Sequence, residues 1–245
     1  MGKTHKKIVM AGVCCLMISM LTGCGNDTTK ITEGMQLVET LDYQGALTAF
    51  DEAEAQKENS RLIARGRGIA SMGLTEYDQA VQYFTEALEL SDGWVQNVDY
   101  DMNYYLAAAY RKNGQPAEAK KVYDAILGLK PEVKDAYFLR GSAELELGDY
   151  ESAKADFDKA ISMDPKNYDR LIEIYEALAD YGYREVGQEY LQNVLNTDKK
   201  LDTYDSGRIY YYLGDYQKAY LALEEAKGKG GVDSYLYLGK AYAAT

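Results

Sequence analysis

Small and apolar side chains recur at steps of three and four along residues 134–167, which is the spacing of one face of a helix. We expect a first helix to begin near Asp135 and a second at Tyr150. Between them, Gly148 can adopt the left-handed backbone that ends a helix, and Asp149 can cap the helix that follows. This stretch therefore predicts two helices joined by a tight turn.

The same pattern returns at nearly regular intervals along the chain. The small residue of the second helix recurs as Ala46, Ala80, Ala119, Ala153, Gly187 and Ala219. A large residue follows four positions later, as Phe50, Phe84, Tyr123, Phe157, Leu191 and Leu223. Such a period predicts an array of helix pairs in which each pair contacts its neighbours.

This combination resembles the tetratricopeptide repeat family, whose unit of about 34 residues carries Leu-Gly and Tyr early, and Ala, an aromatic residue and Pro late. The resemblance implies an all-α fold, a right-handed α-solenoid of helix-turn-helix repeats over residues 31–245. We place the repeats at about 27–58, 59–92, 100–133, 134–167, 168–201 and 200–231, followed by a terminal helix at 232–245.

Three places depart from the regular pattern. Leu41 stands where the first repeat would have its turn glycine, so we expect a strained or re-formed turn there. In the second repeat, aligning Gly66 with the helix glycine and Gly73 with the turn glycine leaves two additional residues, which predicts a longer turn. Surplus residues before the third repeat fall at 93–99, around Trp94, where we expect a loop that serves as a hinge or a contact site.

The first 23 residues have the pattern of a signal peptide. Lysines precede an apolar run from Ile8 to Leu21, which at 14 residues is too short to span a bilayer, since that needs roughly 20. The run ends in Leu-Thr-Gly-Cys24, which resembles the bacterial lipoprotein cleavage motif and implies that Cys24 becomes the acylated first residue. We therefore expect a signal peptide at 1–23 and a tether at 24–30. The mature protein would then be lipid-anchored to a membrane of the cell envelope on its extracytoplasmic side; the alternative is an ordinary signal peptide in which Cys24 is incidental.

The chain is acidic, with 27 Lys and Arg against 39 Asp and Glu. Loss of the three lysines ahead of Cys24 would leave 24 basic residues and a net charge near −15. Such a chain repels nucleic acid, so we expect no nucleic-acid partner. Two readings of the charge stay open: it keeps an array of repeats soluble, or it attracts basic partners.

The composition also limits the chemistry. The only histidine is His5, and Cys14 and Cys15 lie in the signal peptide with it. Histidine-based triads, cysteine nucleophiles and the usual zinc sites are therefore excluded from the mature chain. We expect no catalytic residue, no metal and no cofactor, and hence a protein that is not an enzyme.

The family resemblance implies that first helices line a concave groove. One groove position, three residues before the helix glycine, is apolar or aromatic in every repeat: Ile31, Ile63, Tyr104, Phe138, Ile172, Tyr204 and Leu236. The position one turn further is mixed: Met35, Arg67, Ala108, Ser142, Glu176, Arg208 and Lys240. From these rows we expect a ligand to contact Ile63, Arg67, Tyr104, Phe138, Ile172, Tyr204, Arg208 and Leu236.

Two alternatives accompany this site. The apolar row is either a binding stripe or packing between helices, and Arg65, Arg67 and Arg140 are either anion sites or ordinary surface arginines. The Lys and Asn pattern with which some repeats of this family grip a terminal carboxylate is missing.

The sequence thus predicts a membrane-anchored, non-catalytic scaffold for protein–protein interaction that binds an envelope protein or an exported peptide in its groove. The alternative is a peptide- or solute-sensing receptor lipoprotein. Tyr235, Leu238 and Tyr242 form a stripe on the terminal helix, which predicts self-association unless the helix turns that stripe inward.

Overall fold

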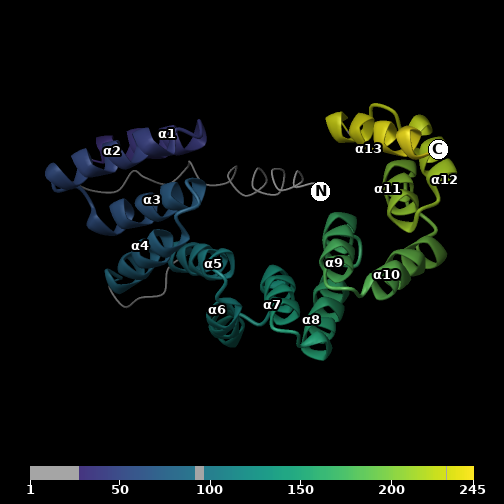
Figure 1. The fold of residues 1–245 in the computed structure, drawn as a ribbon, viewed down its shortest axis with the longest axis horizontal. Coiled ribbons are helices and arrows are strands. Elements are labelled where there is room, and N and C mark those ends of the chain that lie inside the picture. Colours follow the sequence, from purple (N-terminus) through teal and green to yellow (C-terminus); the bar gives the residue numbers. More distant parts are fainter. Residues whose placement is uncertain (1–27, 92–96, 230) are drawn as a thin grey trace. The chain divides into compact units, whose positions relative to one another are not determined.

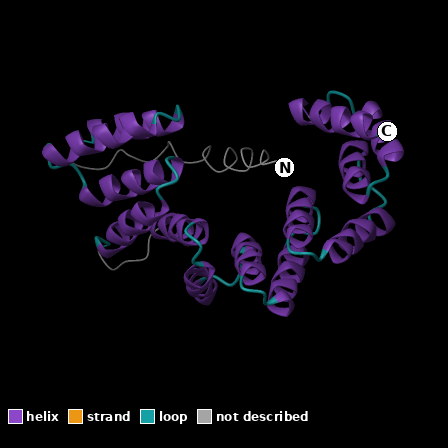
Figure 2. Cartoon of the chain, in the orientation of Figure 1, coloured by secondary structure: helices purple, strands orange, loops and turns teal. Residues whose placement is uncertain are grey.

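The computed structural model describes residues 28–91, 97–229 and 231–245, and within these ranges it contains thirteen helices and no strand (Figures 1 and 2). It divides into an N-terminal body, which ends at Gln115, and a C-terminal body, Pro116–Thr245. The N-terminal body holds α1 (Thr29–Glu39), α2 (Tyr43–Ala55), α3 (Ser60–Gly73), α4 (Tyr77–Glu89) and α5 (Asn97–Lys112). The C-terminal body holds α6 (Pro116–Leu129), α7 (Lys134–Glu146), α8 (Tyr150–Met163), α9 (Tyr168–Asp180), α10 (Arg184–Thr197), α11 (Thr203–Leu213), α12 (Tyr216–Glu225) and α13 (Gly231–Ala244). The all-α prediction is confirmed.

The helix pair expected over residues 134–167 is present as α7 and α8. Gly148 has φ of +78°, the left-handed backbone expected of it. The side chain of Asp149 accepts a hydrogen bond from the Ser152 backbone N–H at 3.2 Å, which satisfies one of the free donors at the start of α8. Local sequence chemistry therefore sets both ends of this turn.

The prediction of a longer turn in the second repeat is wrong. Three residues separate α3 from α4, as they separate α7 from α8, and Thr75 has φ of 64° in the position of the turn glycine. Gly73 is the last residue of α3, where an added Cβ would lie 2.3 Å from the Tyr43 ring. The sequence misleads here because a threonine adopts the backbone that a glycine would be expected to take.

The strained turn expected at Leu41 is confirmed, because this residue also has a left-handed backbone, with φ of 64°. An L-residue in this region brings its Cβ close to the following carbonyl oxygen, at a cost of about 1–2 kcal/mol.

Glycines on the first helices make room for large side chains from the second helices. Gly34, Gly68, Gly141 and Gly207 each stand at the same sequence interval before such a side chain, and an added Cβ would lie 2.6–2.8 Å from it. The partners are Phe50, Phe84, Phe157 and Leu223. The helix glycine of the second repeat is therefore Gly68, two residues after the position that the sequence alignment gave it.

The fifth repeat exchanges the sizes of one packing pair. In the fourth repeat Gly141 on the first helix lies against Ala153 on the second, with 3.1 Å between an added Cβ and the Ala153 carbonyl oxygen. Tyr175 and Gly187 are the equivalent residues one repeat later, so the large residue is now on the first helix. A Cβ on Gly187 would lie 2.9 Å from the Tyr175 ring and 3.1 Å from its Cα. The space between the two helices is therefore filled by a side chain of the first helix.

The core of the C-terminal body lies between successive helix pairs. One cluster joins Leu145, Ala153, Phe157, Ile174 and Leu178, and the next joins Leu171, Ile172, Tyr175, Leu191 and Ile209. Each cluster takes residues from two repeats, so stacking completes a core that one helix pair would leave open. None of the helices within the described ranges has the length and apolar character that crossing a membrane requires.

Candidate functional site: the first-helix face of the C-terminal body

The apolar row splits between core and surface. Ile31, Ile63 and Ile172 are buried, each with at most 4% of its surface exposed, while Leu236 is 46% exposed. Tyr104, Phe138 and Tyr204 are half-buried. The three isoleucines are therefore packing residues, and only the aromatic members and Leu236 are exposed enough to contact a ligand. Cys24, the signal peptide, residues 24–27 of the tether and residues 93–96 of the Trp94 loop lie outside the described residues. The ends of both segments are helical instead, because α1 begins at Thr29 and α5 begins at Asn97.

Three of the eight expected site residues are out of register with the others. Counting from Gly68, the two groove positions of the second repeat are Arg65 and Ile69, not Ile63 and Arg67. In α13, buried Ala241 packs with Ala219 and Leu223 and is the equivalent of Gly207 one repeat later. The residue three positions before Ala241 is Leu238, so Leu236 is not at the groove position that Phe138 and Tyr204 occupy in their repeats.

The aromatic members in the C-terminal body are faced by arginines. The Arg170 guanidinium lies 4.0 Å from the centre of the Phe138 ring, and Arg208 lies 4.6 Å from that of Tyr204. At these distances a cation is attracted by the electrons of the ring. The aromatic faces are therefore partly covered by side chains of the protein itself.

Carboxylates hold both arginines in place. Arg170 donates to Asp135 of α7 at 2.8 Å and forms an ion pair with Glu173 at 2.9 Å. Arg208 is only 7% exposed and donates to Asp169 of α9 and to Asp205. These contacts join α7 to α9, and α9 to α11, along the first-helix side of the body.

Four carboxylates run along α9 at steps of four, three and four residues: Asp169, Glu173, Glu176 and Asp180. We call them the α9 acidic stripe. Asp169, Glu176 and Asp180 are exposed, and like charges at this spacing repel each other by a few tenths of a kcal/mol per pair. Burial, aided by neighbouring carboxylates, raises the pKa of Glu173 despite its arginine partner. The stripe gives this face a negative potential.

Tyrosines border the stripe on the α11 and α13 side. The Tyr212 hydroxyl donates to Glu176 at 2.7 Å and lies 3.1 Å from the Tyr237 hydroxyl. Tyr212 also meets Tyr175 edge-on, with 5.3 Å between the ring centres. The face thus combines fixed aromatic rings with carboxylates, a combination suited to a cationic ligand.

The arginines considered as anion sites already contact carboxylates. Arg65 donates to Asp101 at 2.8 Å, and Arg67 donates to Asp51 at 2.7 Å and to Glu54 at 2.6 Å. These pairs favour the interpretation of ordinary, paired arginines.

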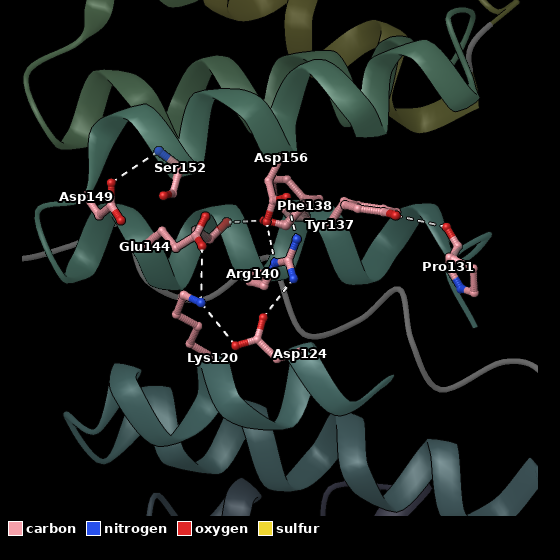
Figure 3. Close-up of polar contacts among 11 residues, drawn as sticks. Lys120, Asp124, Pro131, Tyr137, Phe138, Arg140, Glu144, Asp149, Ser152 and Asp156 are labelled. Atoms are coloured by element: carbon pink, nitrogen blue, oxygen red, sulfur yellow. Dashed lines mark hydrogen bonds and ion pairs between the residues drawn. The ribbon is translucent and has the colours of Figure 1, made fainter. Parts of the chain in front are cut away.

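Sequence reasoning missed a polar cluster around Glu144, shown in Figure 3. Arg140 of α7 donates to both carboxylate oxygens of Asp156 of α8, at 2.7 and 2.8 Å, and to Asp124 of α6 at 2.7 Å. Glu144, one turn further along α7, lies 3.6 Å from the Lys120 amino group. A signal existed in the sequence: the equivalent residue of the next repeat is Leu178, so a carboxylate occupies a core position.

The outer face of α13 carries exposed apolar side chains. Val232 is 84% exposed, Tyr235 54% and Tyr242 71%. Ser234 and Ala241 are buried instead, and Leu238 is half-buried against α12 residues. The stripe predicted from the sequence is therefore not turned inward as a whole.

Two further features bear on ligands. A hollow of about 340 Å³ is lined by Asp164, Lys166, Asn167, Tyr168, Asp169, Asp205 and Arg208. Among the residues that the structure describes, no group of three or more His, Cys, Asp or Glu side chains is arranged to hold a metal ion.

Comparison with known proteins gives consistent results. The family model described as tetratricopeptide repeat matches residues 31–93 and 104–168, more than half of the 245 residues. A TPR repeat-containing protein of Methanocaldococcus jannaschii is 23% identical over 80% of this chain and 35% of its own length. The chain thus spans about a third of that curated relative.

Solved structures agree in fold. MamA from Desulfovibrio magneticus RS-1 has a TM-score of 0.56 and 20% identity, covering 71% of this chain and 98% of that one. YrrB, whose structure is described as a TPR protein with an unusual peptide-binding site, has a TM-score of 0.53 and 21% identity, covering 71% of this chain and 88% of that one. At this level of identity the likeness shows the α-solenoid fold and nothing finer.

Proposed function

The chain belongs to the tetratricopeptide repeat family, and on that premise we propose that it is a non-catalytic scaffold for protein–protein interaction. Its ligand is a protein or peptide, an envelope protein or an exported peptide, which binds along the first-helix face of α7, α9 and α11. A lipid on Cys24 holds the scaffold at a cell-envelope membrane. The peptide-binding site named for YrrB, a protein of the same fold, supports a peptide ligand.

The α9 acidic stripe is the observation that carries this proposal. Three of its four carboxylates are exposed although the spacing makes them repel each other. Arg170 and Arg208 compensate part of the charge, and Tyr204 and Tyr212 stand beside it. The ligand that fits is an extended segment with Lys or Arg side chains, because their charges pair with the stripe and their alkyl stems lie on the rings.

Site-specific crosslinking in membranes tests the proposal. A photo-reactive side chain at Glu176, on the first-helix face, should form a defined adduct with a protein or peptide. The same group at exposed Glu189 on α10, a second helix, is the matched control. Adducts of equal yield at both positions, or at neither, would contradict a ligand on this face.

Charge reversal separates electrostatic recognition from contact alone. Asp180→Lys should weaken formation of the Glu176 adduct and reduce its sensitivity to salt, whereas Glu189→Lys should leave both unchanged. Equal effects of the two reversals would mean that only the total charge of the chain matters.

A second candidate is a peptide- or solute-sensing receptor, which the hollow of about 340 Å³ between α9 and α11 favours. A receptor of this kind would give no protein adduct from Glu176. A small solute would instead slow amide exchange around Asp169 and Arg208.

We further propose self-association through the outer face of α13. The exposure of Val232, Tyr235 and Tyr242 supports it, because large side chains left in water forgo about 1.5–3 kcal/mol each relative to full burial.

A further inference from the structure

Glu144 occupies a position at which the other first helices carry uncharged residues, two of them fully buried. It stands three residues after the helix glycine, where other first helices carry Leu37, Ser71, Tyr110, Leu178 and Tyr210. Leu178 is fully buried there, and Glu144 is only 4% exposed. A carboxylate therefore occupies a buried position at which the other repeats carry no charge.

The two oxygens of this carboxylate have different surroundings. Oε1 lies 3.6 Å from the Lys120 amino group of α6, which also forms an ion pair with Asp124 at 3.0 Å. Oε2 is buried and has no hydrogen-bond partner. Burying a charged oxygen without a hydrogen-bond donor costs free energy, and this cost falls when the carboxylate takes up a proton.

The neighbouring charges do not relieve this situation (Figure 3). Asp156 of α8 and Asp149, which caps that helix, both repel a negative Glu144. Arg140 is bound to Asp156 and to Asp124, and Lys120 is shared with Asp124. Each cation near Glu144 thus already serves another carboxylate.

We propose that Glu144 makes the packing of α6 against the α7–α8 pair sensitive to protonation, so that this packing tightens as the pH falls through neutrality. Burial is the largest cause that raises the pKa of Glu144, to about 7, followed by repulsion from Asp156, while Lys120 and Arg140 oppose the rise. The ordinary pKa of glutamate is about 4.3. The folded chain therefore binds this proton more tightly than the unfolded chain does. The resulting stability is complete below the unfolded pKa and is lost as the pH rises to about 7.

A carboxyl-carbon NMR titration of the full-length protein tests this without any substitution. The Glu144 resonance should titrate near pH 7, well above the ordinary glutamate value of about 4.3. Lys120→Met should move its midpoint higher, because the nearest cation is removed. A Glu144 midpoint near the ordinary glutamate value of about 4.3 would overturn the proposal.

Substitution provides the second measurement. Glu144→Gln is nearly isosteric and copies the protonated state, so it should match wild type at pH 5 and exceed it at pH 8. From this one group, the equilibrium constant for opening of the α6–α7 contact should be about tenfold to 80-fold larger at pH 8 than at pH 5. Hydrogen exchange of α6 and α7 amides, corrected for intrinsic rates, reports that constant.

Glu151→Gln, an exposed change on α8, is the matched control and should keep the pH dependence of wild type. Parallel pH profiles for wild type and Glu144→Gln would show that this carboxylate is not the sensor. These outcomes concern packing alone and are independent of whether the first-helix face binds a ligand.

Discussion

From the exchanged pair Tyr175 and Gly187 we predict that Gly187→Ala destabilises the protein, although replacing a helical glycine by alanine usually stabilises a helix. Replacing a helical glycine by alanine gains up to about 1 kcal/mol of helix propensity. At Gly187 the added Cβ would meet the Tyr175 ring at 2.9 Å and its Cα at 3.1 Å. Because a Cα cannot move as a side-chain end can, overpacking should cost about 1–3 kcal/mol. The net effect of Gly187→Ala is then a destabilisation of roughly 0.5–2 kcal/mol.

The same body contains the control. Gly128 is an exposed residue of α6 with nothing within 4 Å of its missing Cβ, so Gly128→Ala should stabilise by a few tenths to about 1 kcal/mol. Local stability should be measured by native-state hydrogen exchange in α6, α9 and α10, because a repeat array need not unfold in two states. Equal stabilisation by the two substitutions would show that Tyr175 is not held against the α10 backbone.

A double-mutant cycle isolates the pair itself. Tyr175→Gly alone should cost several kcal/mol through the lost core side chain. Combined with Gly187→Ala it recreates the small pair seen at Gly141 and Ala153. The two changes should therefore couple favourably, by about 1–2 kcal/mol, because the clash is absent from the double variant. Additive effects would refute the exchange as the reason for the glycine.

Four other variants have defined outcomes. Leu41→Gly should stabilise the α1–α2 pair by about 0.5–1 kcal/mol in denaturant unfolding, because Leu41 is 70% exposed yet held at φ of 64°; no gain would mean an unstrained turn. Glu58→Gln should cost about 1–2 kcal/mol and speed amide exchange in α1, because this carboxylate is 5% exposed and accepts from two backbone N–H groups at the start of α1, at 2.9 and 3.0 Å; unchanged exchange would contradict its capping role. Cys24→Ser should release the chain from membranes or leave the signal uncleaved, as fractionation and the mass of the mature N-terminus would show, and an unlipidated but cleaved wild type would exclude the anchor. Val232→Lys with Tyr242→Lys should reduce self-association in sedimentation, whereas a wild type that is already monomeric at high micromolar concentration would end that proposal.

The periodic features of the fold could be predicted because they depend on short stretches of sequence. Gly148 and Asp149 act on their own neighbours, so the turn and cap they form follow from local chemistry. The second repeat was misaligned for the same reason. The left-handed residue of its turn is Thr75. The local sequence does not show whether Gly73 ends the helix in a turn or makes room for a packed side chain, and in the structure it makes room for Tyr43. Only the distance to Phe84, which depends on tertiary packing, fixes the register.

The character of the candidate site could be predicted only in part. Spacing along α9 places its carboxylates on one face, and the apolar row follows from the repeat. Which members of that row are exposed depends on contacts between repeats. Ile172 is buried against Leu191 of α10 and Ile209 of α11, and Arg170 reaches Phe138 from the next first helix. The periodic pattern of single residues does not show which residues of neighbouring repeats contact each other.

Pairs of positions carry information that single positions lack, because a close-packed core constrains the sum of two volumes more tightly than either volume. Tyr175 and Gly187 each differ in size from the equivalent residues Gly141 and Ala153, so each taken alone departs from the repeat pattern. Taken as a pair, they fill the space between the two helices of their repeat, as Gly141 and Ala153 do in theirs. The same comparison distinguishes Glu144 from Tyr175. The unusual size of Tyr175 is compensated by its partner, whereas the cations near Glu144, Lys120 at 3.6 Å and Arg140, are both shared with Asp124. No partner side chain of its own neutralises the buried carboxylate of Glu144. Its charge is removed instead when the carboxylate binds a proton.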